Sequence, residues 1–257
     1  MSQVYEWFNY DKRERLDWWW AGGGKLWAAS WTGHEGNNAL LTLLTGRWKG
    51  DRVILYGCEG LELPDDGRPF LKEIEGVCVE DIYFDSLARD VTGLFEEAAG
   101  QINDVFDDDG EFVGEAPYEG PFELTIQWYR YVLNLDRKQF YDRERTAVIG
   151  VWDGKVFRDE LFPALCTIWG RSEMVGGGRL ESWFGEVLAA SNERPGDDFE
   201  DITDVHRTAS VPTDLTDEEI LAFVNKGAPN LNVDPKAWNE HASRRLDELF
   251  PDRRGKA

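Results

Sequence analysis

The densest group of residues suited to binding chemistry lies near the N-terminus, where tryptophans and bases interleave. Trp18, Trp19 and Trp20 are adjacent, Lys25 follows them, and Arg52 begins an apolar run. Indole rings stack on planar or cationic groups, and basic side chains neutralise a phosphate or carboxylate. Alternate side chains of a strand point to opposite faces, so three adjacent indoles cannot all point inward. These five residues are the candidate site for a ligand or partner, and packing of the indoles within the fold is the competing interpretation.

Lys25 also follows a glycine run that could cradle an anion. A P-loop needs a further glycine five residues before Gly24 and a Ser or Thr after the lysine. Trp19 and Leu26 stand at those positions. The sequence therefore favours a turn between strands over a nucleotide-binding loop.

Metal chemistry has little support in the sequence. The acidic run 107–109 precedes Gly110, as in a calcium-binding loop, but Val105 and Ala116 stand where an EF-hand has its first and last ligands. We expect a solvated loop there. The cysteines and histidines lack metal-ligand spacing, and we expect no metal site and no cofactor. They are Cys58, Cys78, Cys166, His34, His206 and His241.

Catalytic signatures are equally sparse. The chain has no local nucleophile motif of the Gly-x-Ser-x-Gly type, and its carboxylates are too numerous for one acid/base pair to stand out. Asn9 and Asp11 recur as Asn134 and Asp136. Such a recurrence points first to turn geometry, because Asn and Asp side chains bond to the backbone of tight turns.

The net charge of −22 over 257 residues opposes binding to nucleic acid or anionic lipid. The acid is unevenly distributed, since residues 1–55 hold seven bases against six acids and seven of the twelve tryptophans. No apolar stretch is long enough for a membrane span, and the first residues do not resemble a signal peptide. We therefore expect a cytoplasmic protein that contacts neither membrane nor nucleic acid directly.

An internal repeat is the strongest organisational signal. The segment 5–13 resembles 130–138, each with an apolar run, Asn-x-Asp and two bases. Weaker matches follow in the same order. They pair Gly24–Trp27 with Gly154–Phe157, Leu40–Trp48 with Leu161–Trp169, and Val79–Ile82 with Phe199–Ile202. The pattern predicts two diverged copies of one unit.

The expected elements make this an α+β protein, in which each unit is a β-hairpin with helices. Apolar and β-branched runs predict strands, and 3.6-residue periodicity predicts helices. Expected strands cover 4–8, 52–57 and 125–133, and expected helices cover 38–45, 87–102, 159–169 and 180–188.

Prolines and glycine at 116–121 predict a boundary between the units. We expect a first unit at 1–118, a second at 119–212 and a helical extension at 213–257. In the extension, Thr216 and Glu219 form a capping box, and Asp234-Pro235 begins a second helix.

The first sixty residues resemble an uncharacterised family of prokaryotic hypothetical proteins. The similar blocks are 9–13 (Asn-x-Asp and two bases), 22–26 (the glycine-rich Lys-Leu segment) and 48–53 (Trp-x-Gly-Asp-Arg). The family's Gly-Asp-Gly becomes Gly22-Gly23-Gly24 here, and its Gly-Asp after the strand becomes Gly57-Cys58. The resemblance implies no activity.

Three functional hypotheses follow. The first is a non-catalytic interaction or accessory protein with a protein partner, which the charge favours as basic, including a DNA-mimic subtype. The second is an enzyme or binding protein for a small anionic or nucleotide-like ligand, in a tryptophan-rich cleft between the units. The third attributes the charge to solubility in a salty cytoplasm.

Overall fold

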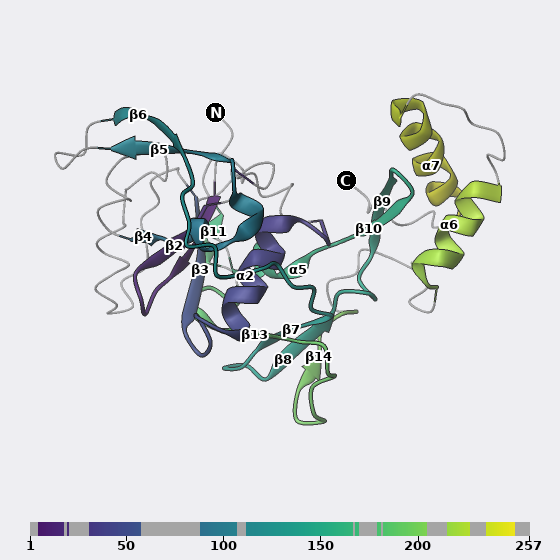
Figure 1. Ribbon diagram of the computed structural model, residues 1–257. Helices are drawn as coiled ribbons and strands as arrows, with labels where there is room; N and C mark the ends of the chain where they lie inside the picture. The colour runs from purple at the N-terminus through teal and green to yellow at the C-terminus, as the bar shows by residue number, and fades with distance from the viewer. Residues whose placement is uncertain are drawn as a thin grey trace.

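The computed structural model describes residues 5–17, 20, 31–57, 88–106, 112–166, 168–169, 179–180, 182–204, 215–226 and 235–249. These residues form an α+β protein (Figure 1). An eight-stranded sheet has the order β14-β8-β7-β13-β3-β1-β2-β4. Its strands are β1 (Tyr5–Asn9), β2 (Glu14–Leu16), β3 (Arg52–Gly57), β4 (Arg89–Asp90), β7 (Tyr131–Asn134), β8 (Gln139–Asp142), β13 (Glu186–Ser191) and β14 (Glu200–Asp201).

Smaller sheets and helices surround this sheet. The two-stranded pairs are β5 (Ile102–Phe106) with β6 (Phe112–Pro117), β9 (Val148–Trp152) with β10 (Lys155–Arg158), and β11 (Ile168–Trp169) with β12 (Arg179–Leu180). The α-helices are α2 (Glu35–Thr45), α5 (Leu161–Leu165), α6 (Asp217–Lys226) and α7 (Pro235–Leu249). Short 3-10 turns are η2 (Thr92–Leu94) and η3 (Glu96–Ala98).

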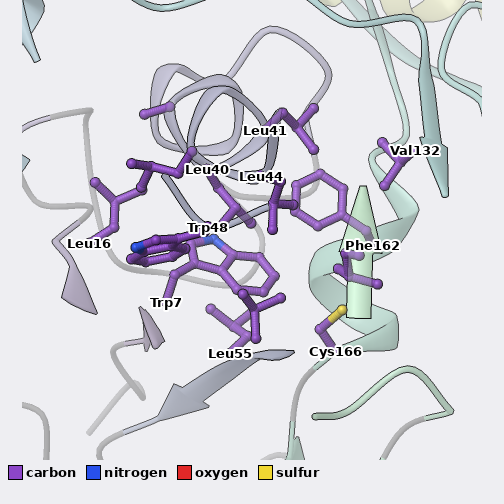
Figure 2. Close-up of a cluster of buried hydrophobic side chains, with 14 of the residues drawn as sticks. Trp7, Leu16, Leu40, Leu41, Leu44, Trp48, Leu55, Val132, Phe162 and Cys166 are labelled. Carbon is purple, nitrogen blue, oxygen red and sulfur yellow. The ribbon is translucent and has the colours of Figure 1, made fainter. Parts of the chain in front are cut away.

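Helix α2 is the centre of the core. Its residues 36–44 are all buried, which a helix covered on several sides requires. Leucines of α2 pack with Trp7 of β1, with Trp48 and with Phe162 of α5 (Figure 2). On another side Thr42 Oγ1 accepts a 2.9 Å hydrogen bond from the backbone N–H of Gln127. The helix thus joins the sheet to the segment before β7.

The recurring asparagines close equivalent hairpin turns. The side-chain oxygen of Asn9 accepts the backbone N–H of Lys12 at 2.7 Å, and that of Asn134 accepts the N–H of Arg137 at 2.9 Å. The next residues, Arg13 and Lys138, have φ of 52° and 53°. The expected role of these asparagines in tight turns is confirmed, although each bond spans three residues and not the two of an Asx-turn.

Further contacts recur between the two halves of the sheet. The indole N–H of Trp48 donates to Glu14 at 2.7 Å, and that of Trp183 donates to Gln139 at 3.1 Å. By these contacts Trp183, rather than Trp169, corresponds to Trp48. At the sheet edges, Thr92 accepts the N–H of Asp17 and Thr203 accepts the N–H of Asp142, both at 2.9 Å. The matches at 24–27 and 79–82 lie outside the described residues, and the duplication itself stays a prediction.

Two expected helices are wrong. Apolar residues of 87–102 do reach the core, but they lie in or next to the short turns η2 and η3 and not on one long helix. Gly100, with φ of 81°, follows these turns. In 180–188 the left-handed Gly185, at φ 68°, separates the buried Trp183 from strand β13. Apolar residues three or four apart also fit a turn followed by a strand, and pairing with a neighbouring strand decides between the two.

Other expectations are partly or fully confirmed. The strand at 52–57 and the helix at 38–45 are present. The helix expected at 159–169 is limited to Leu161–Leu165. The strand expected at 125–133 begins only at Tyr131, as β7. The capping box is formed, because Thr216 N–H donates to Glu219 at 2.8 Å and Glu219 N–H donates to Thr216 at 3.3 Å. Helices α6 and α7 pack back on the β9–β10 hairpin through their apolar faces.

The left-handed turn before β3 gives a stability prediction. Gly50 has φ 82° with open space around an added Cβ, so backbone strain alone should penalise a side chain. Gly50→Ala should lower the free energy of unfolding by about 1–2 kcal/mol. Gly50→Asn should cost less, because Asn tolerates this conformation. Urea unfolding measures both, and equal stability of the Ala and glycine proteins would contradict the prediction.

Candidate functional site

The candidate site is a pocket of about 460 Å³ that is lined by the β9–β10 hairpin, by α6 and by three further segments of the chain. Cavities of a few hundred cubic ångströms are the usual size for small-ligand binding. We call it the hairpin pocket, because β10 and the β9–β10 turn supply much of its wall. It is lined by Thr32, Gly33, Trp128, Arg143, Glu144, Gly154, Lys155, Val156, Phe157, Arg158, Asp217 and Leu221.

The β9–β10 hairpin owes its shape to a tight turn at Asp153-Gly154, with φ of 47° and 68°. Positive φ at both central residues suits a type I′ turn, and Asp-Gly is a preferred sequence for it. Trp152 faces Lys155 across the hairpin, and Val151 faces Val156. The two partners of a cross-strand pair lie on the same face of the hairpin, and the next pair along the strands lies on the opposite face.

One face of this hairpin is covered and the other is open. Val151 and Val156 belong to the cluster that contains Ile220 of α6 and Leu246 of α7. On the opposite face Trp152 is 51% exposed. One face of the β9–β10 hairpin therefore packs on α6 and α7, and the other carries the exposed Trp152. Figure 1 shows this hairpin beside α6.

Trp31 completes that surface. Trp31 is 39% exposed, and its backbone forms an isolated antiparallel β-bridge with Asp159. Its ring centroid lies 5.5 Å from that of Phe157. We call Trp31, Trp152 and Phe157 the aromatic face. Large exposed indoles of this kind are over-represented where proteins meet partners.

A buried ion pair lies next to the pocket, and one of its residues, Arg143, belongs to the lining. Arg143 and Glu160 have fully buried side chains joined by a 2.6 Å contact. Arg143 also donates to Asn38 Oδ1 at 2.9 Å and to the Tyr129 carbonyl oxygen at 2.7 Å. Glu160 accepts the Tyr141 hydroxyl at 2.6 Å. Burial, followed by the nearby Glu160 charge, raises the pKa of Tyr141, so the hydroxyl stays protonated and continues to donate.

The Arg143 guanidinium lies 3.9 Å from the centroid of the Trp128 ring. Because Arg143 is held by several acceptors, the indole rests on a fixed cation. Trp128 is nevertheless 43% exposed, so part of its ring remains accessible in the pocket.

The other charges of the pocket are largely balanced. Arg158 is buried and pairs with Asp217 at 2.8 Å, and Glu144 pairs with Arg130 at 2.9 Å. Lys155 is exposed, and it has no ion pair with any residue that the structure describes. The pocket therefore presents one uncompensated cation beside aromatic side chains.

The five residues chosen from the sequence lie elsewhere or outside the described chain. Trp20 is 9% exposed, stacks on Phe95 at 6.5 Å and donates its indole N–H to the Asp17 carbonyl at 2.7 Å. Arg52 pairs with Asp11 and lies 4.4 Å from the Tyr10 ring centroid. Trp20 and Arg52 thus contact different neighbours. Trp18, Trp19 and Lys25 lie outside the described residues.

The sequence did not predict the residues of the hairpin pocket, because they come from five separate segments. Arg143 and Trp128 have no sequence motif, and only folding brings them together. Asp153-Gly154 between apolar runs was a usable signal, since it predicts a tight hairpin.

A second polar cluster lies on the β1–β2–β4 side of the sheet. Arg15 Nη1 donates to both oxygens of Glu6 at 3.2 Å, and Arg15 Nη2 lies 3.5 Å from Asp90. The Tyr118 hydroxyl lies 3.3 Å from Asp17 and 3.2 Å from Asp90. Burial raises the pKa of Glu6 to about 8, against the attraction of Arg15, and the charges of Asp17 and Asp90 add to the rise.

Comparison of the chain with known proteins gave no match. No protein-family model matches the chain, and neither the curated proteins nor the solved structures contain a match. Within the described residues, no group of His, Cys, Asp and Glu could hold a metal ion, and no helix is long and apolar enough to cross a membrane. The family resemblance of the first sixty residues stays a prediction.

The buried ion pair gives a second prediction. Glu160→Ala should lower the free energy of unfolding by about 3–5 kcal/mol, because it leaves the Arg143 charge buried without its carboxylate. Replacing both residues, Arg143→Met with Glu160→Leu, should cost less than Glu160→Ala alone. Asp198→Ala, which breaks the exposed pair with Lys138, is the control and should change stability little. A double variant less stable than Glu160→Ala would contradict this account.

Glu6 gives a pH prediction. Its pKa is about 8 in the folded chain and 4.5 as a free side chain. Between these pH values the folded state therefore keeps the Glu6 proton, whereas the unfolded state has already lost it. Its stabilising contribution is complete below pH 4.5 and is lost as pH rises to about 8. Relative to Glu6→Gln, the wild-type chain should lose on the order of 3 kcal/mol over this range. Chemical unfolding at several pH values measures it, and parallel stability curves would refute it.

Proposed function

We propose that this chain is a non-catalytic interaction protein that binds a protein partner through the aromatic face. The observation that carries the proposal is the exposure of Trp152, at 51%, on the outward face of the β9–β10 hairpin, together with that of Trp31, at 39%, which lies against Phe157 of the same hairpin. Burying such side chains against a partner removes a large apolar area from water. Tryptophan is also the residue type most enriched among those that dominate binding energy.

The construction of the hairpin supports this proposal. The inner face of β9 and β10 is anchored by α6 and α7, which fixes the position of Trp152 on the outer face. Trp31 comes from a distant segment and rests on Phe157. A rigid aromatic surface loses little conformational entropy on binding, so more of the contact energy appears as affinity.

The charge of the chain favours a basic partner. At −22 the protein attracts cationic surfaces over long range and repels nucleic acid, which accelerates encounter with the former. A basic nucleic-acid-binding protein is one such partner, and a chain that occupied its phosphate groove would act as a DNA mimic. In that case DNA would compete for the partner.

The hairpin pocket favours a second candidate function. Its volume of about 460 Å³, its aromatic wall and Lys155 suit a small anionic ligand. This function needs no protein partner, and of the aromatic face only Phe157 lines the pocket, so the two candidates can be tested separately.

Site-specific photo-crosslinking tests the interaction proposal. A photoreactive amino acid at position 152 should give a discrete crosslinked protein in native lysate, and the product should decrease at least about tenfold in the Trp31→Ala background. Position 135 is the matched control, because Leu135 is also exposed, at 40%, but lies in the β7–β8 turn. Added salt should weaken the crosslink if the partner is basic. Equal products from positions 152 and 135, or none from 152, would contradict the proposal.

A further inference from the structure

We infer that the hairpin pocket binds a small molecule consisting of a planar aromatic ring with an attached anionic group, the ring against Trp128 and the anion at Lys155. This inference rests on the second candidate function and names its class of ligand. It does not depend on the proposed protein contact, because the purified chain would bind the ligand alone. Both residues line the same cavity of about 460 Å³.

Trp128 supplies a stacking surface with a fixed orientation. One side of the indole is occupied by the Arg143 guanidinium at 3.9 Å, and Arg143 is fully buried and held by Glu160. The ring is still 43% exposed, so its remaining surface is available to a ligand. A preorganised ring of this kind binds a planar group without paying for its own ordering.

Apolar residues also line the cavity. Val156, Phe157 and Leu221 are among its lining residues and are only partly buried. A ring that lies against Trp128 would therefore also exchange water for aromatic and aliphatic contacts.

Two of the lining residues, Gly33 and Gly154, are exposed glycines. An added Cβ at either residue would meet no atom within 4 Å. Their φ values of 90° and 68° disfavour other residues there. Both turns therefore present backbone, and no side chain, to the pocket.

The charges identify the second part of the ligand. Glu160 neutralises Arg143, and Asp217 pairs with Arg158, which leaves Lys155 as the cation that can accept an anion. Thr32 adds a polar group at the wall: its Oγ1 accepts the Arg158 backbone N–H at 2.9 Å, and its hydroxyl proton can be donated to a ligand oxygen. A phosphate or a carboxylate fits this arrangement, and the two are distinguished by the probes below.

Calorimetric titration of the purified chain at low salt tests the inference. AMP and indole-3-acetate are the probes, adenosine and indole supply the rings alone, and phosphate and acetate supply the anions alone. At least one of the two probes should bind in a 1:1 ratio, and about tenfold or more tightly than its ring or its anion alone. Binding by AMP identifies phosphate ligands, and binding by indole-3-acetate identifies carboxylates.

Variants then locate the binding. Lys155→Gln should weaken the bound probe about tenfold or more, because it removes a charged hydrogen bond, and should leave binding of the ring alone unchanged. Lys138→Gln, at the β7–β8 turn, removes the same charge elsewhere and should have no effect. Trp128→Leu should weaken the probe and the ring alike, with circular dichroism confirming that the variant folds. Failure of both probes to bind the wild-type chain, or equal affinities of the Lys155 and Lys138 variants, would overturn the inference.

Discussion

The structure depends on one short strand pairing. β3 and β13 pair antiparallel through Val53 with Glu186 and Arg52 with Val187, and this contact joins two four-stranded halves into one sheet. The halves run outward from it in matching order, β3-β1-β2-β4 and β13-β7-β8-β14. The continuous sheet offers a wide surface on which α2, buried over residues 36–44, packs.

Helix α2 connects the sheet to the pocket through a hydrogen bond with Arg143. Asn38, on α2, accepts a hydrogen bond from Arg143, and Arg143 in turn holds the indole of Trp128. A buried guanidinium needs its acceptors in place, so the packing of α2 and the position of Trp128 are physically coupled. The ion pair with Glu160 therefore specifies one arrangement of this region, which is the rigidity that binding at a small pocket requires.

The two halves share turns and edge contacts but differ in their polar interiors. In the first half, Glu6, Asp17 and Asp90 gather around Arg15 and Tyr118. In the second, the residue that corresponds to Asp17 is Asp142, and Arg130 neutralises it at 2.7 Å. The first half thus gathers a buried Glu6 and two half-buried aspartates around one arginine, whereas the second half is followed by the helices that line the hairpin pocket with β10.

The sequence by itself determined the local features: the hairpin turns closed by Asn9 and Asn134, the strand at 52–57 and the capping box at Thr216. Each depends on neighbouring residues, so periodicity and turn chemistry predict it. Tertiary structure decided that residues 186–191 form a strand instead of a helix, because β3 and β7 supply partners from distant parts of the chain. It also decided the pocket, since Thr32, Trp128, Lys155 and Leu221 meet only when the hairpin, α6 and the segment before α2 have packed together.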